Sequence, residues 1–333
     1  MGGTDDVESI RRMAGLATPM ALRVAVTLEL PDQLAGEGTS VEEVALRVSA
    51  DPIALGLLLD HLVTLGVVEQ TGTGYRTTDF GANLRADAGN GLTELLHLKA
   101  AGGRAELAFV ELAHSIRDGG AGYSRRYGQD FWADLADHPG LRESFDRQMT
   151  QRMREQLPRL VAGFDWSRFG TIVDVGGGRG SVLAAILAAN PRMRGHLVDL
   201  APTAAEADRT FRAHGLEGRT EVTAGSFFDP LPAGSEAYLL VDILHDWDDE
   251  HAHRIVGRCV EAAGPDGRLL IVEPVGDRWA GSEFNLAMLV MYGGRERRVD
   301  EFRALCMPHG LALDAITDLT DQRCLLEFRV DAT

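Results

Sequence analysis

Apolar residues follow a helical period in the first hundred residues. Leu22, Val26 and Leu30 recur at every fourth position, and Pro31 is expected to end that helix. Ser40 stands ahead of two glutamates, which is typical of a capped helix start. This part of the chain is therefore predicted to be mainly helical.

A further helix is predicted to begin at Asp51-Pro52 and to stop at Gly66. The apolar face expected for it comprises Ile53, Leu57, Leu58 and Leu62. Two short runs around a glycine turn, at residues 67–69 and 75–77, then predict a small hairpin. Helices followed by a hairpin are typical of a winged helix, a fold that often binds DNA.

After Trp166 the pattern alternates strands with helices, which predicts an α/β fold with a doubly wound, mostly parallel sheet. Strands are expected at residues 171–175, 196–200, 221–223, 237–243, 268–273 and 324–330. A helix is expected at residues 181–189, directly after a glycine-rich loop. Because 333 residues exceed the usual size of a single core, we divide the chain into residues 1–100, 101–160 and 161–333.

The middle segment is helical and carries large apolar side chains. They include Phe131, Trp132, Phe145 and Met149. Such side chains can pack between domains or line a pocket for a flat apolar ligand, since aromatic rings and methionine suit both roles. Both interpretations stay open.

Charge argues against a nucleic-acid partner, because 33 basic residues face 50 acidic ones, a net charge of −17. Residues 1–100 carry 7 basic and 14 acidic residues, a net charge of −7, and the expected recognition helix at 52–65 has neither Lys nor Arg. A DNA-reading domain needs a basic surface. A winged-helix regulator is therefore the weaker alternative, and anionic membrane surfaces are disfavoured for the same reason.

The sequence shows no apolar run of 18 residues and no secretory leader. Its three cysteines, Cys259, Cys306 and Cys324, never stand in CxxC spacing. We therefore expect no membrane span, reduced thiols and a cytoplasmic location.

The loop DVGGGRG predicts a cofactor site. Glycines at 176, 178 and 180 let the backbone approach a ligand closely. Asp174 precedes the loop and can bond backbone amides or an ammonium group. Asp199 ends the next strand, where a carboxylate can accept from both hydroxyls of an unphosphorylated ribose. Together these residues indicate an adenosine-containing cofactor.

Six segments resemble, in this order, the S-adenosylmethionine-dependent O-methyltransferases of the plant caffeate type. They are IVDVGGGRG, HLVDL, AGSFFDPLP, LLVDILHDWDDE, LLIVEPV and MLVMYGGRERR. The likeness is greatest to actinomycete relatives that act on aromatic polyketides and other secondary metabolites. It implies a Rossmann-like class I methyltransferase domain behind a winged-helix-like dimerisation domain that forms an intertwined homodimer. It also implies S-adenosyl-L-methionine as cofactor, S-adenosyl-L-homocysteine as product, and no metal.

The resemblance assigns roles by position. For the cofactor it implies contacts from Gly176, Gly178, Asp199, Ser226 and Phe227. For catalysis it implies His245 as general base, with Glu273 and Glu296 flanking and orienting it. For the acceptor it implies Met149, Met288 and Tyr292.

Two positions depart from the family pattern. Ser226 stands where the family usually has Asp, so the adenine contact is expected to be weaker or made by the backbone. Val241 stands where Lys or Ser is common, which removes a side-chain contact to the cofactor.

A base at His245 is also expected on physical grounds, because ligands gather at the carboxyl ends of parallel strands. Proton transfer from a free phenol to imidazole is uphill by about 3.5 pKa units, or about 5 kcal/mol. A carboxylate on the far ring nitrogen, from Glu273 or Glu296, narrows this gap, and so does a sulfonium charge near the phenol. The following acids, Asp248, Asp249 and Glu250, are expected to form a solvated helix start.

Two other interpretations concern the same segment. A metal site could use Asp246, Asp248, Asp249, His251 and His253, but these stand in consecutive helix-start positions rather than at a ligating spacing. A relative that has lost catalysis would only bind ligands, and the presence of His245 and both glutamates argues against it.

The acceptor is expected to be a hydroxylated aromatic compound, such as a naphthoic acid or a polyketide. A buried carboxylate needs a cation, and Arg11 on the first helix is the candidate, in a domain expected to reach the neighbouring subunit's pocket. In the alternative interpretation, Arg11 is simply solvated.

Overall fold

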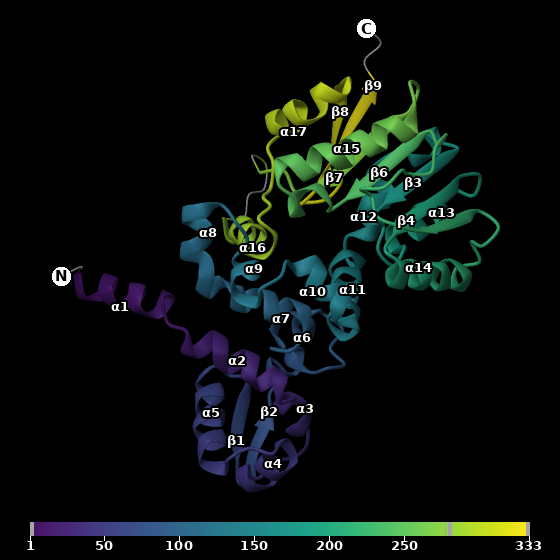
Figure 1. Ribbon diagram of the computed structural model, residues 1–333. Helices are drawn as coiled ribbons and strands as arrows, with labels where there is room; N and C mark the ends of the chain where they lie inside the picture. Colours follow the sequence, from purple (N-terminus) through teal and green to yellow (C-terminus); the bar gives the residue numbers. More distant parts are fainter. Residues whose placement is uncertain (1–2, 277, 279–281, 331–333) are drawn as a thin grey trace. The chain divides into compact units, whose positions relative to one another are not determined.

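The computed structural model describes residues 3–276, 278 and 282–330 and divides into two compact units (Figure 1). The first unit comprises the chain up to Leu107 together with His138–Gln148. The second comprises Ala108–Asp137 and the chain from Met149 onward.

The first unit is a set of helices with a hairpin. Its elements are α1 (Gly3–Met13), α2 (Ala17–Thr27), α3 (Leu30–Gln33), α4 (Val41–Val48), α5 (Pro52–Thr64), β1 (Val68–Thr71), β2 (Gly74–Thr77), α6 (Leu92–Leu96), α7 (Ala101–Glu106) and the first part of α11 (Pro139–Arg154). One apolar core joins α2 to α5 with the hairpin. The predicted winged-helix-like arrangement is therefore confirmed.

Two helix starts in this unit follow the sequence signals. The Ser40 hydroxyl accepts a hydrogen bond from the Glu43 amide, and the Asp51 carboxylate accepts one from the Ala54 amide. The prediction for Pro31 is wrong, since α2 already ends at Thr27 and Pro31 lies in the first turn of α3. Proline fits there because its fixed φ suits a helix start and its missing N–H has no partner to lose.

Helix α5 is apolar on more than one face. Leu55, Leu59 and Leu62 are buried, whereas Ile53 and Leu57 are 77% and 71% exposed. Two residues of the predicted face therefore remain outside the core of this unit.

The second unit contains the large sheet. Its helices are α8 (Leu112–Asp118), α9 (Gly122–Tyr127), α10 (Phe131–Asp137), the end of α11, α12 (Leu157–Ala162), α13 (Ser181–Ala189), α14 (Ala201–Ala213), α15 (Asp249–Ala263), α16 (Ser282–Tyr292) and α17 (Val299–Cys306). Its strands are β3 (Thr171–Val175), β4 (Arg194–Asp199), β5 (Thr220–Ala224), β6 (Ala237–Val241), β7 (Arg268–Glu273), β8 (Leu311–Asp318) and β9 (Cys324–Val330).

The sheet confirms the predicted doubly wound fold. Its strand order is β5-β4-β3-β6-β7-β9-β8, with β3 to β7 parallel and β9 antiparallel to both neighbours. Strand β8, at the edge, was not predicted from the sequence. The direction of strand addition reverses between β3 and β6, and ligands of doubly wound sheets bind at the carboxyl ends of such a pair.

Both faces of the sheet are covered, as the continuous apolar run at 237–241 requires. Tyr238 and Leu240 belong to a core shared with α15 and α17. Leu239 points to the opposite core, which α12, α13 and α14 complete (Figure 1). The strand ends are thereby held rigidly.

In the described ranges no helix has the length and apolar character needed to cross a membrane. Cys259, Cys306 and Cys324 are buried and form no disulfide.

Candidate active site

Two loops meet at the carboxyl ends of β3 and β6. One is the glycine loop that follows β3, and the other is the turn of residues 242–247 that follows β6. A Cβ added to Gly176 would lie 2.6 Å from the side chain of Ile243, which shows how closely the two loops approach.

The glycine loop is shaped by left-handed backbone. Gly176, Gly178 and Gly180 have φ values of 73°, 59° and 77°, which residues with a Cβ rarely adopt. The Gly178 amide donates to Asp199 Oδ2 at 2.8 Å, and the Leu200 amide donates to Asp199 Oδ1 at 2.7 Å. Asp199 is thus held against the loop at the end of β4.

Asp174 is the buried acid beneath the loop. Its side chain is 1% exposed, and neither carboxylate oxygen has a hydrogen-bond partner within the described part of the chain. Burial, and secondarily the Asp199 charge, raise its pKa to about 7. A buried acid without a donor is unfavourable, so this position fits a ligand that brings an ammonium or another donor.

Ser226 and Phe227 follow β5 and are half-buried. The Ser226 hydroxyl accepts from the Phe228 amide at 3.2 Å. The Phe227 ring lies next to Gly176, since a Cβ there would be 3.4 Å from it. Phe227 thus borders the glycine loop, and Ser226 precedes it in the chain.

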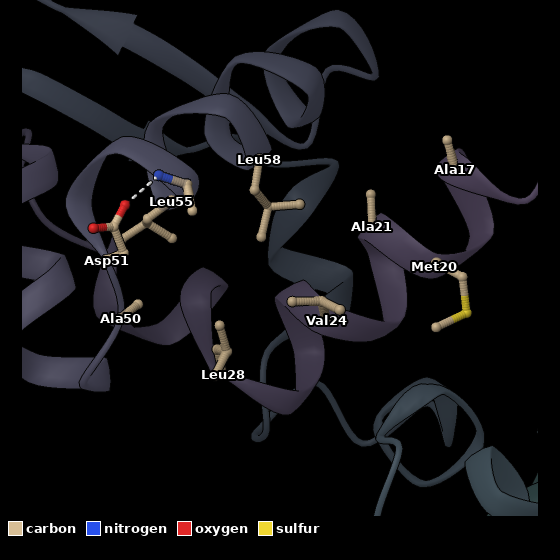
Figure 2. Close-up of a pocket in the computed structure, with 10 residues that line it drawn as sticks. Ala17, Met20, Ala21, Val24, Leu28, Ala50, Asp51, Leu55 and Leu58 are labelled. Atoms are coloured by element: carbon tan, nitrogen blue, oxygen red, sulfur yellow. Dashed lines mark hydrogen bonds between the residues drawn. The ribbon is translucent and has the colours of Figure 1, made fainter.

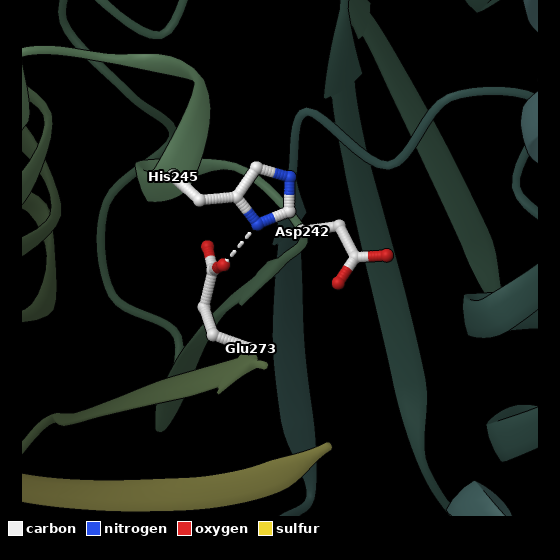
Figure 3. A group of neighbouring side chains, drawn as sticks. All are labelled: Asp242, His245 and Glu273. Atoms are coloured by element: carbon white, nitrogen blue, oxygen red, sulfur yellow. Dashed lines mark hydrogen bonds and ion pairs between the residues drawn. The ribbon is translucent and has the colours of Figure 1, made fainter. Parts of the chain in front are cut away.

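His245 stands on a turn fixed by the neighbouring strand. Glu273, at the end of β7, is 0% exposed, and its Oε1 accepts from the amides of Ile243 at 2.9 Å and Leu244 at 2.7 Å. Its Oε2 accepts from Nδ1 of His245, which is 4% exposed (Figure 3). One carboxylate therefore positions both the backbone and the imidazole.

Glu296 has a different partner. Its Oε2 accepts from the Asn285 side-chain amide at 3.0 Å, and its own amide donates to Asn285 Oδ1 at 2.8 Å. Of the two glutamates predicted to orient His245, the structure places Glu273 on the ring.

Arg297 locks the histidine turn from the other side, a role not anticipated from the sequence. Its side chain is 1% exposed and donates to the carbonyls of Leu244 at 2.6 Å and Trp247 at 2.9 Å. It also donates to Asp249 Oδ1, so that acid is not the purely solvated residue expected. The lack of a side chain at Gly294 lets the segment that carries Arg297 lie close to the histidine turn, because a Cβ at Gly294 would lie 2.1 Å from the His245 carbonyl oxygen.

The charges around His245 favour its protonated form. Burial lowers the pKa of His245. The carboxylates of Glu273 and Asp246 raise it by more than burial lowers it, so that this pKa is about 9. Asp246 Oδ1 lies 3.4 Å from Nε2, the nitrogen that does not face Glu273. Burial raises the pKa of Asp246 itself to about 7. The imidazole must therefore lose a proton before it can act as a base.

Aromatic rings stack beside this turn. Trp132 stacks on Tyr292 at 5.4 Å and on Trp247 at 6.0 Å between ring centroids, and Phe131 meets Tyr292 edge-on at 5.1 Å. Tyr292 and the buried Met288 come from α16. Met149 begins the part of α11 that belongs to this unit.

A cation missed by the sequence analysis also lies here. The guanidinium of Arg152, on α11, lies 4.8 Å above the ring centroid of Phe284. That ring in turn meets the His245 imidazole edge-on at 5.6 Å. Arg11 belongs to the other unit, where it is exposed on α1 and pairs with Glu8 at 3.3 Å.

Three possible metal ligands converge within 4.8 Å of one another, namely Asp242, His245 and Glu273 (Figure 3). Asp242 is already held by the buried Arg323 through two hydrogen bonds of 2.8 and 2.6 Å. Glu273 accepts three hydrogen bonds. Asp248, one of the residues considered as a metal ligand from the sequence, caps α15 by accepting a hydrogen bond from the His251 amide. These acids are thus already engaged by protein donors.

Two family models and several known proteins match this chain. The model of the O-methyltransferase domain matches residues 109–312, and that of the O-methyltransferase dimerisation domain matches residues 10–87. The 2,7-dihydroxy-5-methyl-1-naphthoate 7-O-methyltransferase of Streptomyces carzinostaticus is 45% identical over 92% of this chain and 93% of its own. Aclacinomycin 10-hydroxylase of Streptomyces purpurascens is 38% identical over 91% and 84%.

A solved O-methyltransferase from neocarzinostatin biosynthesis has the same fold. Its complex with S-adenosylmethionine and 2-hydroxy-5-methyl naphthoic acid matches with a TM-score of 0.91 at 42% identity, over 96% of this chain and 98% of that chain. Its complex with S-adenosyl-L-homocysteine and 1,4-dihydroxy-2-naphthoic acid gives a TM-score of 0.92. With its class I methyltransferase sheet and these matches, the chain belongs to the O-methyltransferase family.

Proposed function

We propose that the enzyme transfers a methyl group from S-adenosyl-L-methionine to a phenolic hydroxyl of an aromatic acid of the naphthoate class. The observation that carries this proposal is the His245–Glu273 pair, buried at the end of β6 beside the glycine loop. The naphthoate enzyme at 45% identity and the naphthoic-acid complexes of the neocarzinostatin enzyme support the acceptor class.

The glycine loop and its acids suit the cofactor. When bound, S-adenosyl-L-methionine supplies an electrophilic methyl group on a sulfonium. Asp174 accepts from its ammonium group, which gives the buried carboxylate the donor that it lacks. Gly176 and Gly178 admit the ligand to the backbone, Asp199 accepts from the ribose hydroxyls, and Ser226 with Phe227 borders the adenine.

His245 acts as the general base. Glu273 holds the Nδ1 proton, which leaves Nε2 to accept a proton from the acceptor hydroxyl. With the pKa of His245 near 9 and that of a free phenol near 10, the uphill gap falls to about 1 pKa unit, or about 1.4 kcal/mol. The neutral imidazole is scarce at neutral pH, and a positive charge bound nearby lowers the pKa and increases its share. No metal takes part in this scheme, since the chain's own donors already engage Asp242 and Glu273.

His245→Ala tests the proposal. We expect kcat to fall by about 10²–10⁴-fold, with the affinity for S-adenosyl-L-homocysteine nearly intact. A fall of less than about threefold at saturating acceptor would reject the base role, because general bases contribute far more than that.

The rival is a member of the family that binds ligands without transferring methyl groups. That alternative must be tested, because a relative at 38% identity is named as a hydroxylase. A single-turnover experiment with labelled S-adenosyl-L-methionine distinguishes a methyltransferase from such a binding protein. The transferase yields labelled acceptor and S-adenosyl-L-homocysteine in equal amounts, whereas a binding protein yields neither.

We further propose that the enzyme is a homodimer joined through its first unit. We keep the proposed division of the chain into residues 1–100, 101–160 and 161–333. An apolar groove of about 420 Å³ lies between α2 and α5 (Figure 2). Helix α1 exposes Val7, Ile10 and Met13. A monomer would leave this apolar surface in water, which favours a second copy as its cover. The dimerisation-domain match at residues 10–87 supports the same partner.

A cytoplasmic location fits the buried cysteines that form no disulfide, because reducing compartments prevent disulfide formation. The net charge of −17 disfavours binding to nucleic acid, because the phosphate backbone is negatively charged as well.

A further inference from the structure

Arg152 and His245 contact the same aromatic ring from different elements. Arg152 comes from the last turn of α11, Phe284 from the start of α16, and His245 from the turn after β6. The guanidinium carbon lies 4.8 Å above the Phe284 ring centroid, and the imidazole centroid lies 5.6 Å from it. A cation is therefore held one ring away from the proposed base.

The guanidinium of Arg152 retains its donors for a ligand. Across residues 3–276, 278 and 282–330 the guanidinium forms no hydrogen bond or ion pair. It contacts the Phe284 ring, its charge acts at longer range on Asp246 and Glu296, and its side chain is half-buried. The other arginines near the turn are occupied. Arg297 binds two carbonyls and Asp249, and Arg323 binds Asp242.

The surroundings of Arg152 are acidic. Burial raises the pKa of Asp246 to about 7, and the charges that oppose this rise come from His245 and Arg152. Burial raises the pKa of Glu296 as well, and the same two cations oppose it. A ligand carboxylate beside His245 would thus face several carboxylates and needs a cation of its own, because an uncompensated buried charge costs several kcal/mol.

From this arrangement we propose that Arg152 binds the carboxylate of the aromatic acid acceptor while the acceptor hydroxyl faces Nε2 of His245. The planar guanidinium can take both carboxylate oxygens at once. Phe284 holds the guanidinium plane by a cation–π contact. The carboxylate and the reacting hydroxyl would then lie at different edges of the ring system. This inference rests on the proposed function, and it replaces Arg11 as the cation for that carboxylate.

The test compares an acid with its neutral analogue. The probes are 1,4-dihydroxy-2-naphthoic acid and its primary amide. Binding is measured by calorimetry with S-adenosyl-L-homocysteine present, and KM and kcat are measured separately. The variants are Arg152→Met, which removes the charge at similar length, and Arg152→Lys, which keeps the charge without the planar fork.

For Arg152→Met we expect Kd and KM for the acid to rise about 10- to 100-fold, the range of a lost hydrogen bond to a charged group. The amide should change less than about threefold, and Arg152→Lys should recover part of the acid's affinity. Arg154→Met is the matched control, since Arg154 is exposed at the end of the same helix, and it should leave both probes unaffected.

Equal losses for acid and amide, or no loss for either, would overturn the assignment of Arg152 while wild-type methylation of the probes still upholds the proposed function. An acid-selective loss in Arg11→Met but not in Arg152→Met would return the carboxylate to Arg11. If the wild type methylates neither probe and binds neither, the proposed function fails, and this inference fails with it.

Discussion

At the scale of single residues, the site relies on a few side chains that each have more than one role. Glu273 accepts from two backbone amides and from the imidazole, so the same carboxylate shapes the turn and sets the basicity of His245. Asp199 likewise holds the Gly178 amide while it ends β4. Changes at these residues should therefore affect affinity or pH dependence rather than kcat alone.

The pH dependence follows from the raised pKa of His245. Below a pH of about 9 most of the imidazole is protonated and cannot accept a proton, so kcat/KM should rise with pH, with its midpoint near 9 and its plateau above that pH. In Glu273→Gln the charge that raises this pKa is gone, so the midpoint should move to lower pH. The plateau should also fall, because an amide can donate to Nδ1 and leave the proton on Nε2. A midpoint that does not move would show that another group controls the profile.

Asp199 can be tested by binding alone. Asp199→Ala should weaken S-adenosyl-L-homocysteine binding by about tenfold or more, as expected when hydroxyl donors lose a charged acceptor. Asp199→Asn, which can still accept from the Gly178 amide, separates the ribose contact from the shape of the loop. Calorimetry measures both. Unchanged affinity in Asp199→Ala would show that Asp199 does not bind the ribose.

At the scale of elements, the turn after β6 is clamped between two neighbours. Strand β7 supplies Glu273 beneath it, and the segment ahead of α17 supplies Arg297 and Gly294 beside it. The turn is therefore rigid because of partners far away in sequence, and its geometry does not depend on its own residues alone.

Arg297→Met should expose that dependence. It leaves the carbonyls of Leu244 and Trp247 without their donor, and the free energy of unfolding should fall by at least about 2 kcal/mol. Denaturant unfolding measures the loss. As a control, Arg298→Met changes an exposed neighbour and should stay within about 0.5 kcal/mol of the wild type. Equal stability of the two variants would contradict the clamp.

At the scale of the whole molecule, assembly depends on apolar surface that one chain leaves uncovered. The exposed side chains of α1 and the groove between α2 and α5 belong to the same unit. Ile53 and Leu57 on α5 add to this surface. Two copies would bury what one copy cannot.

Ile10→Glu should therefore shift the chain from dimer toward monomer, because a charge on the α1 face would be buried on association without a partner. Sedimentation velocity across a concentration series measures the shift. Met307→Glu changes a residue of similar exposure in the second unit and should leave the wild-type state intact. A wild type that stays monomeric, or an Ile10→Glu variant as dimeric as the wild type, would reject this interface.

The sequence by itself determined those features that a short stretch of chain specifies. The helix starts at Ser40 and Asp51 depend on residues three positions apart, and both helices begin where the sequence predicts. The glycine loop and the helix at 181–189 depend on adjacent residues that need left-handed backbone and a strand-to-helix turn. The fold class follows from the alternation of apolar runs, since a strand buried on both faces must be apolar throughout.

Only the tertiary structure decided which distant groups meet. Both glutamates were candidates for His245, but strand β7 lies beside β6, and this pairing brings Glu273 to the ring. Arg152 is absent from the sequence prediction because its contact with Phe284 joins two helices more than a hundred residues apart in the chain. Contacts of this kind arise from packing, and the spacing of residues along a chain carries no record of them.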